Sequence, residues 1–283
     1  MLLHVTHETR YDYAPPVETA QHLAHLKPRE TPSQRLVSHA LSITPAPAQQ
    51  NESPDLYGNT RAFFALESTH EELVVTAESV VETSTPVLAA SIARELPWEE
   101  VRERFRYRKG SRFDAASDFV FPSRYVPRHD DFATYARPSF APGRPTFDVA
   151  TDLMQRMYRD FDYDAGSTEI STPAVEALAQ RKGVCQDFAH ILIACFRTMG
   201  LPARYVSGYL YTTAEHAASH AWVDVWLKDH GWISIDVTNR QYASEQHCRL
   251  AVARDYDSAS PVRGVRTGGG HESMAVHVHV QQQ

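Results

Sequence analysis

The 283-residue sequence contains only three cysteines, Cys185, Cys195 and Cys248. Their number is odd and their spacing does not repeat, which disfavours a disulfide framework or a structural zinc site built on cysteine pairs. No apolar run approaches the roughly 18 residues that a membrane-spanning helix needs. Each cysteine therefore needs its own explanation.

The sequence also lacks an excess of positive charge and a targeting segment. Its formal net charge is −7, which argues against a general nucleic-acid binder. The opening residues MLLHVTHETRYDY alternate in polarity, whereas a signal peptide has a basic stretch followed by a continuous apolar one. We therefore expect a cytoplasmic protein with no nucleic-acid partner and no membrane attachment. The oligomeric state stays open.

Periodicity divides the chain into three predicted parts. Runs such as RLVSHALSITP and EELVVTAESVVET alternate apolar and polar residues, which predicts antiparallel strands and a β-sandwich-like N-terminal domain over residues 1–84. Helical spacing and then many prolines, arginines and aromatics follow, which indicates a helical and irregular connector over 85–146. Residues 147–283 begin with helical segments and end with strand-like ones, so we expect an α+β core there.

One cysteine lies at the start of a predicted buried helix, in GVCQDFAHILIACFRTMG. From Asp187 to Met199 this segment is apolar on nearly every side, as in a helix that protein surrounds. Cys185 would lie at its N-terminus, where unpaired N–H groups and the helix dipole favour a thiolate. A small buried cysteine is the commoner alternative. A histidine and a carboxylate are therefore needed to support a nucleophile.

Two predicted strands, in SHAWVDVW and GWISIDV, supply both groups. Each strand alternates aliphatic residues with polar or aromatic ones, so the two sets point to opposite faces of a sheet. The aliphatic faces coincide only if the loop has an odd number of residues, for example 228–230, which pairs Trp226 with Trp232. This register places His220 diagonal to Asp236, within side-chain reach. With Cys185 they fit the triad of a thiol acyl-transfer enzyme.

The segments GVCQDFAHILIACFRTMGLPARYVSGYL, SHAWVDVW and GWISIDVTN closely resemble the transglutaminase-like superfamily, in its bacterial branch of predicted cysteine proteases. THETRYDYAPPVETAQHLAHLKPRE and YGNTRAFFALE resemble the β-rich N-terminal domain of that branch. The resemblance implies an α+β fold with a papain-like, transglutaminase-like catalytic core, in which the nucleophile-bearing helix packs on an antiparallel sheet after a small all-β domain. It implies Cys185 as nucleophile, His220 as base and then acid, and Asp236 as the group that orients His220.

The activity expected from the triad is hydrolysis of amide bonds in peptides or small amides through a thioester on Cys185. Backbone N–H groups at the helix start could stabilise the oxyanion. Candidate side chains for oxyanion or substrate binding are Gln186, Asp187, Trp222 and Tyr209.

Two other functions stay open at this point. A transglutaminase that accepts an amine would use the same thioester, and a catalytically silent scaffold would only bind a partner. We predict no cofactor. We also predict no metal, because His277 and His279, which alternate on one strand, have no third ligand at motif spacing.

Overall fold

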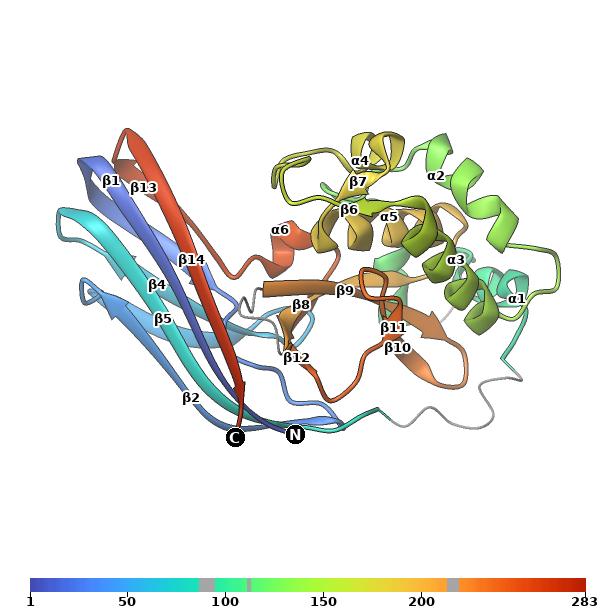
Figure 1. The fold of residues 1–283 in the computed structure, drawn as a ribbon, viewed down its shortest axis with the longest axis horizontal. Helices are drawn as coiled ribbons and strands as arrows, with labels where there is room; N and C mark the ends of the chain where they lie inside the picture. Colours follow the sequence, from blue (N-terminus) through green and yellow to red (C-terminus); the bar gives the residue numbers. More distant parts are fainter. Residues whose placement is uncertain (87–94, 111–112, 213–218) are drawn as a thin grey trace.

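The computed structural model describes residues 1–86, 95–110, 113–212 and 219–283 (Figure 1). Long antiparallel strands form one side of the molecule, and a second, shorter sheet with its helices forms the other side (Figure 1). The predicted α+β fold with a β-rich N-terminal region is therefore confirmed. Within the described residues, no helix is long and apolar enough to cross a membrane.

The first sheet is antiparallel and is organised around one long strand, β1. Its seven strands are β1 (Leu2–Ala24), β2 (Gln34–Thr44), β3 (Gln49–Pro54), β4 (Thr60–Leu66), β5 (His70–Thr83), β13 (Val262–Gly268) and β14 (His271–Gln282). A register shift between Asp12 and Val17 divides β1 into two parts. The first part pairs with β5 and β14, and the second part pairs with β4 and β13. Alternate residues from Leu3 to Tyr13 are buried, as the period-two pattern predicts.

The last two strands correct one predicted boundary. The sequence predicts that the core spans residues 147–283, yet β13 and β14 pair with β1 along most of its length, from Leu3↔Gln282 to Ala24↔Val262. Without them one edge of β1 would leave its backbone N–H and C=O groups unpaired, which a strand avoids. Alternation in MAVHVHV predicts a strand but does not identify the sheet that the strand joins. The core therefore ends before residue 262.

The second sheet carries the helix that begins at Cys185. Its strands are β8 (Ala203–Leu210), β9 (Ser219–Leu227), β10 (Gly231–Asp236), β11 (Gln241–Tyr242) and β12 (His247–Ala253), in the order β11-β10-β9-β8-β12. Helix α5 (Cys185–Thr198) packs on β8 and β9, and each of its residues from Asp187 to Arg197 is buried. The predicted register of β9 and β10 is confirmed, because Trp226 pairs with Trp232 across a three-residue loop.

The remaining helices pack on α5, on one another or on the second sheet. They are α1 (Trp98–Phe105), η2 (Ala115–Val120), α2 (Asp130–Ala136), η3 (Arg137–Ser139), α3 (Thr146–Asp160), α4 (Ala174–Gln180) and α6 (Tyr256–Ala259). Two-residue strands β6 (Asp162–Tyr163) and β7 (Lys182–Gly183) pair in parallel. The predicted connector 85–146, apart from residues 87–94 and 111–112 outside the described ranges, contains short helices. Their residues Val101, Phe132 and Tyr135 share one hydrophobic core with α5, so this segment is part of the core's packing.

Gly208 is required where β8 passes under Trp222. A Cβ at this position would lie 2.5 Å from the Trp222 ring and would also clash with the backbone oxygen of Cys248. Because crowding a packed interior is destabilising, we expect Gly208→Ala to lower the free energy of unfolding by about 1–3 kcal/mol. Urea unfolding measures it. The control is Gly166→Ala, whose new Cβ would come no closer than 3.6 Å to its nearest neighbour; equal losses in the two variants would contradict this explanation.

Candidate active site

Cys185 and His220 line the same cleft, whose volume is about 320 Å³. Cys185 comes from the first turn of α5, and His220 comes from the second residue of β9. Because α5 packs on β9, the fold brings together two residues that are 35 positions apart in the sequence. The cleft is thus the place where the predicted nucleophile and base meet.

The start of α5 is held by a carboxylate rather than by a hydroxyl cap. Asp187 accepts hydrogen bonds at Oδ2 from the backbone N–H of Val184, at 2.9 Å, and from the Thr168 hydroxyl, at 2.7 Å. Its side chain also packs closely on Gly183, where a Cβ would lie 2.7 Å from Oδ2. Asp187 is buried and is not among the cleft-lining residues. Asp187 therefore holds the start of the helix, and with it the partly buried Cys185, without entering the cleft.

His220 is held by Asp236, as the predicted register requires. The Nε2 atom of His220 lies 2.9 Å from Oδ2 of Asp236, whose side chain is fully buried. Burial alone would lower the pKa of His220, but hydrogen bonds to Asp236 and to Cys185 raise it to about 10. The same contact, with others from the neighbouring residues, holds the pKa of Asp236 far below its usual range despite burial. The imidazole therefore favours its protonated form, with Nδ1 left for other partners.

Two further residues hold Asp236, and the sequence analysis missed both. Asn239 donates from its side chain to Oδ2 at 2.8 Å and from its backbone to Oδ1 at 3.1 Å. His247 lies with Nε2 at 3.1 Å from Oδ2. Asn239 follows Asp236 by three residues, a spacing typical of a side chain that caps a turn. His247 comes from β12, and no sequence pattern around it indicates a contact with Asp236.

The ligand atoms of His220, Asp236 and His247 lie within 4.8 Å of one another, which is close enough for a shared metal ion. Both imidazole Nε2 atoms, however, are already at hydrogen-bond distance from the same carboxylate oxygen. Metal-binding nitrogens must be free of protons. We therefore interpret the cluster as a hydrogen-bond network that orients His220.

The other predicted side chains lie in different places. Gln186 lines the cleft, and its Nε2 donates to the backbone oxygen of Ile170 at 3.2 Å. Trp222 stacks on His220 with ring centroids 6.0 Å apart, and Tyr209 is hydrogen-bonded to Nδ1 of His7 at 2.9 Å. Both are buried, and neither is among the described residues that line the cleft. Of the four candidates, only Gln186 borders the space next to Cys185.

The first sheet forms the far wall of the cleft. His7, Thr9 and Tyr11 come from the buried face of β1, and Met274 and Val276 come from β14. Burial lowers the pKa of His7 to about 4, so this histidine is neutral near pH 7. No Asp, Glu, Lys or Arg lines the cleft within the described ranges. The wall is therefore uncharged.

Replacing Asp236 with asparagine is expected to lower the pKa of His220 from about 10, although the contribution of Cys185 would remain. The burial that opposes the charged imidazole would remain, while the anionic acceptor that offsets it would be lost. NMR titration of the His220 ring nitrogens measures the change. Asp12→Asn, in a half-exposed pair with Arg10, is the control. An unchanged His220 titration would show that Asp236 does not set its protonation.

Two family descriptions match this chain. Residues 3–82 match the bacterial transglutaminase-like N-terminal region, and residues 133–237, which include Cys185, His220 and Asp236, match the transglutaminase-like superfamily. The chain belongs to the transglutaminase-like superfamily. The superfamily match begins at residue 133, inside the segment predicted as a connector, which agrees with the packing of α2 against α5.

Several proteins are similar to this chain over part or nearly all of its length. An uncharacterized protein of Mycobacterium tuberculosis is 38% identical over 275 residues, which span 92% of this chain and 86% of that one. The crystal structure of a candidate cysteine protease from Cytophaga hutchinsonii has the same fold, with a TM-score of 0.76 at 22% identity over 99% of this chain and 90% of that one. A protein-glutamine gamma-glutamyltransferase of Pseudomonas aeruginosa is 27% identical over 137 residues, or 41% of this chain and 20% of that one.

Proposed function

We propose that this protein is a thiol-dependent acyl-transfer enzyme that hydrolyses amide bonds of peptides or small amides. One observation carries the proposal: Cys185 shares a cleft with His220, and His220 is hydrogen-bonded to the buried Asp236. A nucleophile, a base and an orienting acid in this relation are the parts that acyl transfer needs.

In the proposed reaction the Cys185 thiolate attacks the amide carbonyl and forms a tetrahedral intermediate. The His220 imidazolium then donates its proton to the leaving amine, the C–N bond breaks, and a thioester remains on Cys185. The neutral imidazole next takes a proton from water as the water attacks the thioester. The carboxylic acid leaves, and the thiolate and imidazolium are restored. Asp236 keeps Nε2 occupied, so Nδ1 is the ring nitrogen that exchanges the proton.

Backbone groups at the start of α5 supply the proposed oxyanion site. Val184 N–H is bound by Asp187, and Phe188 N–H begins the regular helical bonds by donating to Val184 O. The N–H groups of Cys185 and Gln186 lie between them in the first turn, where helical N–H groups have no acceptor within the helix. Aimed at the attacked carbonyl, they would stabilise its developing charge.

Hydrolysis is favoured over amine transfer because Cys185 is only partly buried in the cleft, so water can reach a thioester there. Amine transfer requires that water be kept away from the thioester. The similarity to a protein-glutamine gamma-glutamyltransferase keeps amine transfer as the alternative, although the match spans only 20% of that enzyme.

The test is a product assay with a mixture of unstructured peptides and a biotinylated primary amine. We expect new peptide termini by mass spectrometry in the wild type and none with Cys185→Ala. Biotin incorporation without new termini would instead identify a transglutaminase. If neither product forms and no acyl group is found on Cys185, the protein is not an acyl-transfer enzyme and a binding scaffold becomes the better description.

A further inference from the structure

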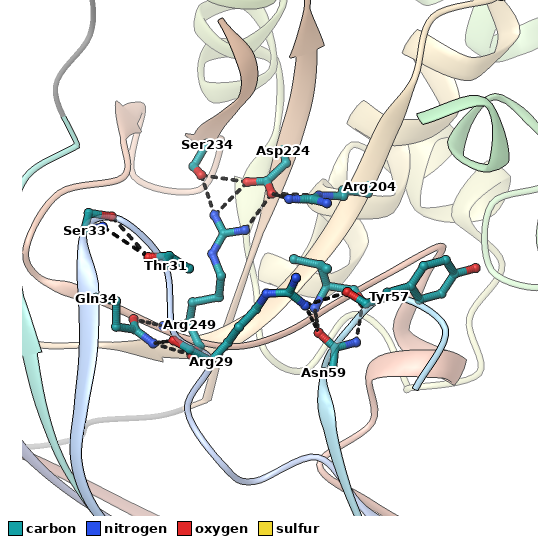
Figure 2. Close-up of polar contacts among 11 residues, drawn as sticks. Arg29, Thr31, Ser33, Gln34, Tyr57, Asn59, Arg204, Asp224, Ser234 and Arg249 are labelled. Carbon is teal, nitrogen blue, oxygen red and sulfur yellow. Dashed lines mark hydrogen bonds and ion pairs between the residues drawn. The ribbon is translucent and has the colours of Figure 1, made fainter. Parts of the chain in front are cut away.

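A second cavity, of about 650 Å³, lies between the first sheet and the second one and shares no residue with the cleft of Cys185. On one side it is lined by the segment after β1, including Arg29, Thr31 and Ser33. On the other side it is lined by strands of the second sheet, including Arg204, Asp224 and Arg249. Figure 2 shows how these side chains approach one another. Boundaries between structural units are frequent ligand sites.

Two guanidinium groups bind one carboxylate in this cavity wall, and a third guanidinium lies nearby. Asp224 is fully buried and accepts from Arg249 at 2.6 and 2.9 Å and from Arg204 at 2.8 and 2.9 Å (Figure 2). Arg29 lies close enough that its positive charge disfavours the charged form of Arg204. The three arginines are set against Asp224 and the exposed Glu30, which leaves an excess of one positive charge in the lining, and Asp55 beside Arg29 offsets part of it. A partly buried excess of like charge is unfavourable unless an anion balances it.

Each arginine keeps N–H groups that the protein does not use. Arg29 donates from Nη1 to Tyr57 O at 2.7 Å and to Asn59 Oδ1 at 2.8 Å, and its Nε and Nη2 have no acceptor within the described chain. Nη1 of Arg204 and Nε of Arg249 likewise have no acceptor among the described residues. Guanidinium groups are the usual partners of carboxylate and phosphate oxygens.

The rest of the wall suits a small polar anion. Thr31, Ser33 and Ser84 are among the lining residues, and Trp232 provides a flat side against which the Arg204 guanidinium stacks, 4.2 Å from the ring centroid. Glu30 is the one acidic lining residue besides Asp224 in the part of the chain that the structure describes, and it is exposed. It lowers the positive charge of the cavity without neutralising it.

We propose that this cavity binds a small molecule through a phosphate or carboxylate group held by Arg29, Arg204 and Arg249. The site is separate from the cleft of Cys185, and its occupancy does not depend on the proposed acyl-transfer activity.

Calorimetric titration at fixed ionic strength tests the site, with inorganic pyrophosphate as the phosphate probe, citrate as the carboxylate probe and sodium chloride as the reference. We expect one saturable site per chain for at least one of the two probes. The tighter probe identifies the source of the anionic group. Binding of neither probe beyond the chloride reference overturns the proposal.

Variants locate the binding. Arg204→Gln keeps a donor for Asp224 and removes a charge, so we expect affinity to fall at least roughly tenfold. Glu30→Gln removes a repelling charge from an exposed position, so it should fold normally and bind roughly threefold more tightly. Glu71→Gln, exposed on β5 and away from the cavity, should bind as the wild type does. If Arg204→Gln does not fold, the comparison of Glu30→Gln with Glu71→Gln is the test. Equal affinities of these two variants for the anion would overturn the proposal.

Discussion

Replacing His220 with alanine is expected to slow amide hydrolysis by roughly four orders of magnitude, because a nucleophile and its base act as one unit. The protein should stay folded. Asp236 would lose one hydrogen-bond partner but would keep Asn239 and His247. The buried carboxylate would therefore still have hydrogen-bond partners. The measurement is kcat/KM for a peptide identified by the product assay, with His271→Ala, an exposed residue of β14, as the control.

Alkylation gives the same test without a substrate. At pH 6 roughly 0.3% of ordinary thiols are ionised, so a thiol that reacts quickly there must be assisted. We expect iodoacetamide to label Cys185 at pH 6 and His220→Ala to slow this labelling at least about tenfold, after allowing for the greater nucleophilicity of a more basic thiolate.

The other two cysteines serve as internal references for this labelling. Burial raises the pKa of Cys195 and of Cys248 to about 12, so both should stay unlabelled. Mass spectrometry assigns the labelled site. Labelling of Cys185 at the same rate in both proteins would exclude the thiolate–imidazolium pair, and with it the catalytic proposal.

Replacing Asp224 with asparagine is expected to lower the free energy of unfolding by about 3–5 kcal/mol, since it would leave Arg204 and Arg249 largely buried without their shared counter-charge. Each arginine side chain is only 15% exposed, and the carboxylate is fully buried. Urea unfolding at pH 7 measures the loss. The control, Asp12→Asn, removes a half-exposed carboxylate paired with Arg10, and should change stability by less than about 1 kcal/mol.

The stabilisation by Asp224 should also depend on pH in a defined direction. Burial would raise the pKa of this carboxyl group, but Arg249 and Arg204 lower it to about 2. A carboxyl group whose folded pKa lies below the unfolded value near 3.8 stabilises the protein above that pH and loses the effect as pH falls through the folded pKa. The difference between wild type and Asp224→Asn should therefore shrink between about pH 4 and pH 2. A stability difference that stays constant over this pH range would show that the charge of Asp224 is not the cause of the stabilisation.

Local patterns were sufficient for the hairpin that carries His220 and Asp236. Side chains alternate strictly along a strand, so the positions of the aliphatic residues fixed whether the loop was odd or even. The observed pairing of Trp226 with Trp232 and the 2.9 Å contact between His220 and Asp236 confirm the register. The buried helix after Cys185 was predictable for the same reason, because its apolar residues leave no solvent-facing side.

Contacts between distant segments were beyond these patterns. His247 contacts Asp236 although β9 and β8 lie between β10 and β12 in the sheet, and nothing near His247 in the sequence signals this contact. The charged cavity has the same origin, since Arg29 and Arg249 come from parts of the chain more than two hundred residues apart. Such sites depend on how the sheets pack, which no single segment encodes.

The wall strand β14 also bears on the order in which the protein is made. Synthesis runs from the N-terminus, and domains fold as their residues emerge, so Cys185, His220 and Asp236 all leave the ribosome before Met274 and Val276. Until β14 pairs with β1, a nascent chain would carry the three reactive groups beside an incomplete cleft. The last strand of the chain thus completes the far wall of the cleft, and a chain that ended before residue 271 would lack the part of that wall that β14 supplies.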